Sequence, residues 1–472
     1  MNAEVTVIAL NGLESMVKKR KRDSPDLRRI TTNRTTSSGD SNPSSVHDYF
    51  SMYCYAWDVL DEGPDSFARL AQEVGLTNIS MAVSYHGGKA LLPHNAKHHV
   101  HFIEEGAVYF QPSRRFFGTT KMKPRISRLA ADRDILGDIV EACGKKGIAT
   151  TAWTVAIHNT YLGTKYPELT TQNVFGDRYF HSLCPSQPDV MAYMRALASN
   201  LASYPIDAVE FETFEFVPFR HYAFIEKEGM RVTPLAGILL SLCFCPACLL
   251  AAKRFRIKAG AVAKAVRLWL NKYFEGKNRF PETIESGISS IPGLLEYLDM
   301  RFNVLADAFK DIADLLHAKK KKVIPLIIGQ ERRLDYLTGV DLQRVARNAD
   351  AIEILFYNRH PREAASTVRA IHEAAGRDIN VYFAVRPGHP DVEDANGVIR
   401  MTNSILKGGG KGISYYNFGL FEKHHMDWIC RAIGQTNEGK HKPSRVDAKG
   451  NRRLESDRRG NFVAANVLRP GI

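Results

Sequence analysis

The feature that most constrains the fold is a series of eight short segments, rich in β-branched and aromatic residues, that alternate with helical patterns from residue 49 onward. Strands separated by helices predict βα units and a parallel sheet. Eight such units are typical of a (β/α)8 barrel, whereas a six-stranded doubly wound sheet would leave two units unexplained. We therefore expect an α/β fold of the TIM-barrel type. The expected strands are 49–57, 78–85, 148–157, 207–214, 322–328, 350–357, 380–385 and 412–418.

The segments between these strands have the apolar spacing of amphipathic helices. No G-x-G-x-x-G sequence follows the first strand, so the sequence does not indicate a dinucleotide site, and we expect no cofactor. The expected helices are 65–75, 134–147, 188–203, 294–319, 341–349, 361–376, 394–409 and 421–434.

The barrel domain would span 49–434, well above the usual size of about 250 residues. Three long segments, 86–133, 158–187 and 215–293, follow the second, third and fourth strands and account for the excess. All three lie at the carboxyl ends of strands, where barrel active sites are built. We therefore expect these insertions to shape a binding site.

Two polar segments flank the predicted barrel, an N-terminal tail at 1–48 and a C-terminal tail at 435–472, and we expect both to be disordered. The net charge is +13, of which the N-terminal tail carries +2 and the C-terminal tail +5. The charge left on the barrel is too dilute for a nucleic-acid-binding face, which clusters Lys and Arg. The sequence therefore predicts no nucleic-acid partner, and we interpret the basic run at 18–22 as solvated.

Hydrophobic residues make up 44% and charged residues 24% of the chain, values typical of a soluble globular protein. Seven cysteines are few and odd in number, which argues against a disulfide-stapled secreted protein. The N-terminus also lacks the basic start and apolar middle of a secretory signal. We expect a cytoplasmic protein; the sequence leaves the oligomeric state open.

One uncharged stretch, 235–252, just reaches the length of a membrane span. Pro246 and three cysteines interrupt it, so we predict a buried loop and helix and no membrane partner. Cys243, Cys245 and Cys248 offer three soft metal ligands, but no second CxxC or paired histidine stands nearby to complete four. The sequence therefore favours no metal and leaves the question open at these cysteines, while His94, His98, His99 and His101 read as loop residues.

Two glutamates stand at alternate positions of the fourth predicted strand. Glu210 and Glu212 therefore point to the same side, and Val209 and Phe211 to the other. Because apolar side chains face the helices, we expect the glutamates to point into the barrel. Inward carboxylates near a barrel mouth are usually catalytic or tied to Arg or Lys. We predict catalysis for Glu212, and we leave Glu210 between catalysis and a scaffold role.

Other polar and aromatic residues follow the ends of predicted strands, where hydroxyl groups of a sugar need hydrogen bonds and its ring faces need stacking. Each could instead make an ordinary turn or cap. Asp58 and Glu226 are the candidates for a second catalytic carboxylate. The candidate substrate-binding residues are Trp57, Tyr85, His86, Arg125, His158, Asn159, Tyr357, Arg386 and Asn417.

Over residues 50–434 the chain resembles a largely uncharacterised group of bacterial (β/α)8-barrel proteins described as glycoside-hydrolase-like. The resemblance implies a catalytic carboxylate at the end of the fourth strand, which here is Glu212. It also implies a second carboxylate at the end of strand six or seven, where this chain has Tyr357 and Arg386 instead. The motifs that carry the resemblance are 55–58, 84–86, 152–154, 158–159, 175–178, 183–186, 209–212, 242–248 and 415–419.

These observations lead to the hypothesis of a glycosidase that cleaves a glycosidic bond in a small saccharide or glycoside by carboxylate acid/base catalysis. Two alternatives stay open. One is a metal-dependent sugar isomerase or lyase on the same barrel. The other is a catalytically silent barrel that binds saccharide or a protein partner, because barrels host many functions.

Overall fold

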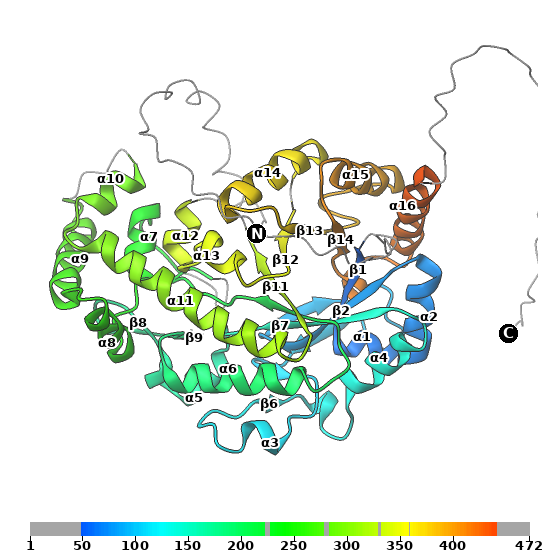
Figure 1. The fold of residues 1–472 in the computed structure, drawn as a ribbon, viewed down its shortest axis with the longest axis horizontal. Helices are drawn as coiled ribbons and strands as arrows, with labels where there is room; N and C mark the ends of the chain where they lie inside the picture. The colour runs from blue at the N-terminus through cyan, green and yellow to red at the C-terminus, as the bar shows by residue number, and fades with distance from the viewer. Residues whose placement is uncertain (1–48, 222–226, 278–282, 329–331, 358, 441–472) are drawn as a thin grey trace, which may run out of the picture. The chain divides into compact units, whose positions relative to one another are not determined.

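Eight parallel strands close into a barrel in the computed structural model, which describes residues 49–221, 227–277, 283–328, 332–357 and 359–440 (Figure 1). Around the ring the order is β1, β2, β7, β10, β11, β12, β13 and β14, and β14 pairs again with β1. This closed ring confirms the TIM-barrel prediction. The strands are β1 (Tyr49–Cys54), β2 (Asn78–Tyr85), β7 (Ala149–Val155), β10 (Ala208–Glu212), β11 (Lys322–Ile327), β12 (Ala351–Leu355), β13 (Asn380–Val385) and β14 (Gly412–Tyr415).

Both faces of the barrel strands are buried, as parallel sheets require. On β10, Val209 and Phe211 pack into the main hydrophobic core shared with the outer helices. Glu210 lies on the opposite, inner side, between Trp153 on β7 and Ile324 on β11 in the strand register. The alternation seen in the sequence thus sets which side chains fill the barrel.

An outer layer of helices covers the barrel (Figure 1). Several begin at a capping side chain, which satisfies free backbone N–H groups of the first turn. Asp134, for example, accepts a hydrogen bond from the Gly137 N–H at 3.1 Å and starts α4. The helices are α2 (Pro64–Val74), α4 (Ile135–Gly144), α6 (Pro188–Leu201), α11 (Leu294–His317), α13 (Leu342–Ala346), α14 (Ala364–Ala375), α15 (Ala395–Lys407) and α16 (His425–Lys440).

Several strands end two or three residues earlier than predicted. The first stops at Cys54, and α1 (Ala56–Glu62) follows at once. The Asp58 carboxylate accepts the Tyr55 N–H at 2.8 Å, which starts that helix, so Asp58 lies in a helix and not at a strand end. Likewise Asn417 accepts the Gly419 N–H at 3.2 Å and begins the short helix η5 (Phe418–Leu420).

The three long insertions after β2, β7 and β10 all carry structure of their own. After β2 come β3 (Gly88–Leu91), β4 (Val100–Ile103), β5 (Ala107–Val108), α3 (Arg114–Phe117), β6 (Arg125–Ile126) and η2 (Arg128–Ala130). After β7 come α5 (Thr160–Lys165), η3 (Pro167–Leu169), β8 (Thr170–Gln172) and β9 (Arg178–Leu183). After β10 come α7 (Pro234–Leu240), α8 (Pro246–Arg254), α9 (Ala259–Phe274) and α10 (Ile284–Ser289).

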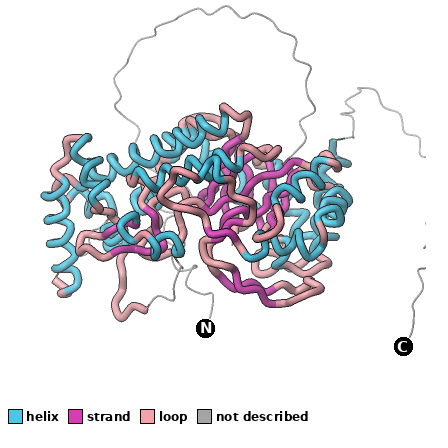
Figure 2. Tube along the Cα trace, turned by 90° about the horizontal axis from the view of Figure 1, so that it is seen from below, coloured by secondary structure: helices cyan, strands magenta, loops and turns pink. Residues whose placement is uncertain are grey.

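Helices α7 to α10 stand beside the barrel on the left of Figures 1 and 2 and enclose a second hydrophobic core. Helix α11 takes part in both cores. Leu294 and Leu298, in its N-terminal half, pack with α7 to α10, whereas Phe309 and Ile312, in its C-terminal half, pack with the barrel. One long helix therefore joins the insertion to the barrel.

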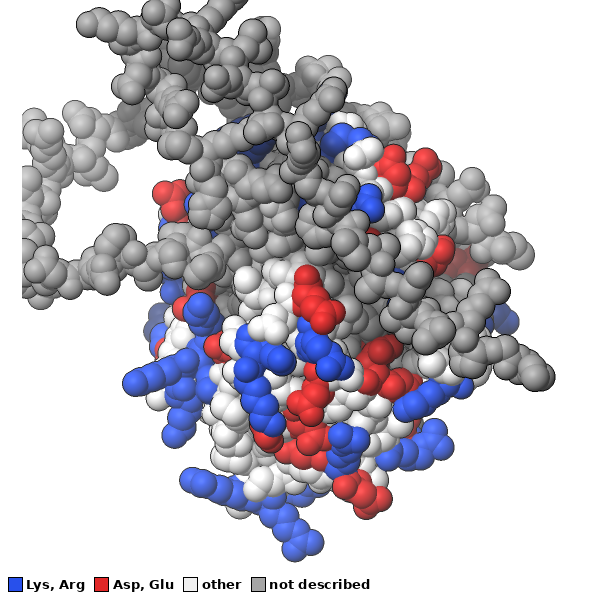
Figure 3. All heavy atoms as spheres, turned by 90° about the vertical axis from the view of Figure 1, so that its right-hand side faces the viewer, with Lys and Arg blue, Asp and Glu red and all other residues white. Residues whose placement is uncertain are grey.

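The uncharged stretch 235–252 forms α7 and α8, which are separated by a turn at Cys243–Cys245. Among the described residues, no helix is long and apolar enough to cross a membrane. Figure 3 views the side on which α2 and α16 lie, and Lys and Arg side chains there stand among Asp and Glu side chains. Residues 435–440 of the predicted C-terminal tail form the last turns of α16, so the prediction of disorder is wrong for them. The rest of the two predicted tails, 1–48 and 441–472, lies outside the described residues.

Candidate functional site

Two glutamates lie fully buried inside the barrel. Glu210 on β10 accepts hydrogen bonds from the hydroxyl groups of Tyr53 and Ser80, the latter at 2.9 Å. Glu353 on β12 is also 0% exposed, and neither of its oxygens has a hydrogen-bond partner among the described residues. Two hydroxyl groups therefore hold the Glu210 carboxylate in place inside the barrel.

Burial raises the pKa of both of these carboxyl groups. Burial raises the pKa of Glu353 to about 7, and the nearby Ser414 and Tyr53 hydroxyls offset part of that rise. Burial, followed by the charge of Glu353, raises the pKa of Glu210 well above its ordinary value. Because like charges in a dry interior repel, this pair retains a proton near neutral pH.

Glu212 lies two residues further along β10 and is partly exposed. Its Oε2 accepts the indole N–H of Trp153 at 2.7 Å. Burial raises the pKa of Glu212, and the charge of His86 and the Trp153 hydrogen bond act in the opposite direction. Of the two carboxylates on β10, Glu212 is therefore the more exposed. The indole N–H of Trp153 orients it.

Aromatic side chains from several strand ends surround Trp153. Its ring centroid lies 4.9 Å from Tyr53, 5.6 Å from Tyr55 and 4.9 Å from Tyr85. The Tyr55 hydroxyl is 3.3 Å from that of Tyr85 and 3.0 Å from that of Tyr416. We call these five residues with Glu212 the aromatic mouth. Tyr53, Tyr55, Tyr85 and Trp153 are each at most 6% exposed, so these rings pack chiefly against one another.

An arginine from the end of β13 extends this group. The Arg386 guanidinium lies 4.6 Å from the ring centroid of Tyr357, which itself lies 5.7 Å from Tyr416. Arg386 also donates two hydrogen bonds to Asp391, at 2.8 and 2.7 Å. The fork geometry of this pair fixes the guanidinium plane beside Tyr357.

Four histidines form a cluster next to Tyr85. The His86 ring stacks on Tyr85 at 4.4 Å and on His158 at 4.8 Å, and His221 meets His158 edge-on at 4.5 Å. Burial lowers the pKa of His158 to about 2 and that of His221 to about 4. These two imidazoles are therefore neutral at pH 7. His181 completes the cluster.

A further carboxyl group follows β10 after a left-handed residue, Thr213, whose φ is 54°. Burial, followed by the charge of Glu212, raises the pKa of Glu215 to about 8. Its Oε1 is buried without a hydrogen-bond partner among the described residues. The Glu215 carboxyl group is therefore protonated at neutral pH. It lies close enough to Glu212 for the charge of Glu212 to contribute to this raised pKa.

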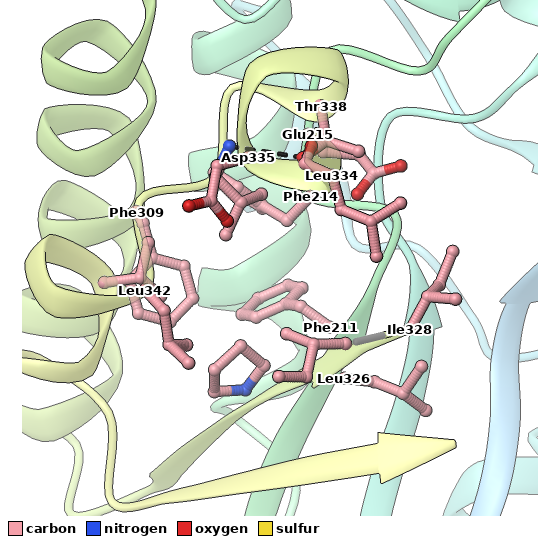
Figure 4. Close-up of a pocket in the computed structure, with 14 residues that line it drawn as sticks. Phe211, Phe214, Glu215, Phe309, Leu326, Ile328, Leu334, Asp335, Thr338 and Leu342 are labelled. Carbon is pink, nitrogen blue, oxygen red and sulfur yellow. Dashed lines mark hydrogen bonds between the residues drawn. The ribbon is translucent and has the colours of Figure 1, made fainter. Parts of the chain in front are cut away.

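Glu215 and Asp335 lie at one end of a small cavity next to α12 (Arg332–Thr338), with Phe211, Phe214 and Phe309 toward the other end (Figure 4). The cavity has a volume of about 50 Å³, which is room for a few water molecules at most. It is therefore too small to hold a sugar ring.

The structure brings six of the predicted site residues together around the aromatic mouth: Glu212, Tyr85, His86, His158, Tyr357 and Arg386. Others serve local structure. Trp57 is 1% exposed and stacks against Tyr55 at 4.4 Å, and Asn159 caps α5 through the Leu162 N–H at 2.8 Å. Arg125 donates to the Glu105 carbonyl at 3.1 Å. Glu226 lies outside the described residues.

Sequence reasoning missed Glu215 and Glu353, and it used Trp153 and Tyr416 only as parts of motifs. Glu353 could have been found, because the alternation along β12 places it with Ala351 and Tyr357 on the inner side. Glu215 follows the end of its strand, where side-chain alternation no longer applies. The described residues that come close enough to share a metal ion are four cysteines, none of which belongs to the aromatic mouth.

Solved structures similar to this chain include two glycosidases. A β-galactosidase from the psychrophilic Marinomonas ef1 aligns with a TM-score of 0.51 and 10% identity, over 82% of this chain and 59% of the galactosidase. The α-L-fucosidase isoenzyme 2 from Paenibacillus thiaminolyticus aligns with a TM-score of 0.47 and 12% identity, over 84% of this chain and 50% of the fucosidase. The chain therefore shares a TIM-barrel fold with the β-galactosidase. It spans about half to three-fifths of these relatives, and no protein-family model or curated protein matches it.

Proposed function

We propose that this barrel hydrolyses a glycosidic bond in a small saccharide or glycoside, with Glu212 as a reacting carboxylate. The observation that carries the proposal is the placement of Glu212 within the aromatic mouth, oriented by the Trp153 N–H at 2.7 Å. Glycosidases stabilise a sugar cation between two carboxyl groups, and tyrosine and tryptophan faces bind the sugar ring. The fold shared with solved glycosidases is consistent with this function.

Hydrolysis needs one carboxyl group that donates a proton and one that is ionised. Glu215 suits the first role, because its raised pKa of about 8 keeps it protonated at neutral pH. Glu212 is the candidate for the second role: burial raises its pKa, and the charge of His86 and the Trp153 N–H act against that rise and favour the ionised form. Glu212 then stabilises or attacks the anomeric carbon while Glu215 protonates the leaving oxygen.

The remaining residues of the site would bind the substrate. Tyr357 would contribute its hydroxyl group, which has no hydrogen-bond partner among the described residues. His158 is neutral and neither of its ring nitrogens has a partner among them, so it can both donate to and accept from a sugar hydroxyl. Arg386 is held by Asp391 and supplies a fixed cation.

The test is hydrolysis of aryl glycosides of different sugars by the wild-type chain, Glu212→Gln and Glu215→Gln. Glu373→Gln, on the exposed side of α14, is the matched control. We expect the control to keep its rate and Glu212→Gln to lose turnover by at least about 100-fold. Glu215→Gln should lose turnover on poor leaving groups and keep much of it on dinitrophenyl glycosides, which depart without protonation.

Two outcomes would overturn the proposal. Unchanged turnover in Glu212→Gln would remove the chemistry from the aromatic mouth. Absence of turnover on every glycoside, with saccharide binding measured by calorimetry and unaltered in Glu212→Gln, would favour a silent binding barrel.

A further inference from the structure

Four cysteines from two different insertions meet in the structure. Cys184 directly follows β9, Cys243 and Cys245 lie in the turn between α7 and α8, and Cys248 lies in the first turn of α8. All four are 0% exposed, and their sulfur atoms lie within 4.8 Å of one another. Cys243, Cys245 and Cys248 are close in sequence, whereas Cys184 comes from a distant segment and brings the number of cysteines in the cluster to four.

The distances between the sulfur atoms fit a shared metal ion. Cys184 Sγ lies 3.5 Å from Cys248 Sγ, 3.8 Å from Cys243 Sγ and 3.7 Å from Cys245 Sγ. A disulfide needs about 2.05 Å. Four sulfurs at the corners of a tetrahedron with Zn–S bonds of about 2.3 Å stand about 3.8 Å apart. We propose that Cys184, Cys243, Cys245 and Cys248 bind one zinc ion as four thiolates.

The surroundings of the cluster stabilise sulfur anions. The Gln172 N–H donates to Cys243 Sγ at 3.3 Å, and the Gln187 side-chain amide to Cys245 Sγ at 3.7 Å. The Ser186 hydroxyl lies 3.2 Å from Cys248 Sγ. Such outer contacts fix the orientation of metal ligands and are a regular part of zinc sites.

A buried cation lies close to the same cluster. Arg301 on α11 is 0% exposed, and its guanidinium donates to the backbone carbonyls of Tyr336 and Leu337 at 2.9 and 3.1 Å. Burial lowers the pKa of Arg301, and the charges of Cys248, Cys243 and Cys184 act against that fall. Zinc with four thiolates carries a net charge of −2, so the positive charge of Arg301 offsets part of it.

The zinc ion would link the histidine cluster, which lies next to Tyr85, to the helical insertion. Strand β9 hydrogen-bonds to the segment after β7, through Leu183 N–H to Ile157 O at 3.0 Å and Asn159 N–H to His181 O at 3.0 Å. Cys184, next in the chain, would be tied through the metal to α8. The ion would therefore hold His181 and its neighbour His158 in position without touching substrate.

The test is the metal content of the full chain, purified without chelators, by mass spectrometry of the elements. We expect one zinc per chain in the wild type and less than about one tenth of that in Cys184→Ser. Cys430→Ser, at an exposed position, is the matched control and should keep one zinc. A mercurial reagent that modifies thiols should release the ion from the wild type.

A second measurement does not depend on whether Cys184→Ser folds. After zinc is exchanged for cobalt in the wild-type chain, four thiolates predict the strong visible bands of tetrahedral cobalt together with sulfur-to-cobalt charge transfer. Seven free thiols in a metal-free chain that takes up no zinc or cobalt would overturn the proposal, as would a disulfide among the four cysteines. Stoichiometric iron in place of zinc would overturn the choice of metal, and full zinc in a folded Cys184→Ser would overturn the ligand set.

Discussion

Replacing Glu353 tests whether burial inside the barrel makes the free energy of unfolding depend on pH. Both Glu353 and Glu210 are fully buried. The Tyr53 and Ser80 hydroxyl groups donate hydrogen bonds to Glu210, whereas neither oxygen of Glu353 has a hydrogen-bond partner among the described residues. In Glu353→Gln an amide of nearly the same shape cannot ionise. We expect this variant to be more stable than the wild type at alkaline pH and of similar stability at acidic pH.

The magnitude follows from the pKa of Glu353, which rises from 4.5 to about 7 in the folded chain. Below pH 4.5 both folded and unfolded chains hold the proton, and the wild type has its full stability. Between pH 4.5 and 7 the folded chain still holds a proton that the unfolded chain has released, so stability falls as the pH rises. At about 1.4 kcal/mol per pH unit, the loss amounts to about 3 kcal/mol.

The assay is urea unfolding followed by tryptophan fluorescence at pH 5, 6, 7 and 8. The free energy of unfolding of Glu353→Gln minus that of the wild type should grow by about 3 kcal/mol across this range. Glu373→Gln, an exposed change of the same kind, should show a constant difference. Parallel pH curves for the wild type and Glu353→Gln would refute the reasoning, because the buried carboxyl group would then bind its proton equally well in the folded and unfolded chain.

Three further predictions concern hydrogen bonds, pH and metal. Tyr53→Phe removes a donor from buried Glu210 and should lower the free energy of unfolding by about 1–3 kcal/mol in urea titrations; no loss would mean that water replaces the hydroxyl. The rate of hydrolysis should fall as the pH rises through about 8, where Glu215 loses its proton. In Glu215→Gln the rate should not fall in this pH range; a fall that persists in the variant would mean that another group donates the proton. Zinc removal by a chelator should make two segments, β8 to β9 and α7 to α8, sensitive to protease while the barrel strands and α6 stay resistant. Digestion followed by mass spectrometry would show this, and an unchanged cleavage pattern would contradict the linking role of the ion.

Much of the barrel could be predicted from sequence because each strand buries both faces and each helix buries one. Those periodicities are local, and they placed all eight strands and the inward side of Glu210 and Glu212. Strand ends were less predictable, because capping contacts such as Asp58 to the Tyr55 N–H end a strand where the apolar run continues.

The site was only partly predictable for a related reason. Tyr85, His86 and Arg386 follow strands and could be placed on one rim, but their contacts depend on how the insertions fold back. Cys184 shows this best, because its contact with Cys248 joins positions 64 residues apart and belongs to no spacing motif. Such a cluster is a property of tertiary structure.

Helix α11 has a consequence for how the molecule opens. Its N-terminal half is packed in the core of α7 to α10 and its C-terminal half in the core of the barrel, so a single ladder of backbone hydrogen bonds crosses from one to the other. When the core of α7 to α10 unfolds, the backbone hydrogen bonds of α11 are lost first near Leu294. When the core of the barrel unfolds, they are lost first near His317. Amide exchange along these 24 residues thus reports, within one element, whether the two cores melt together or in succession.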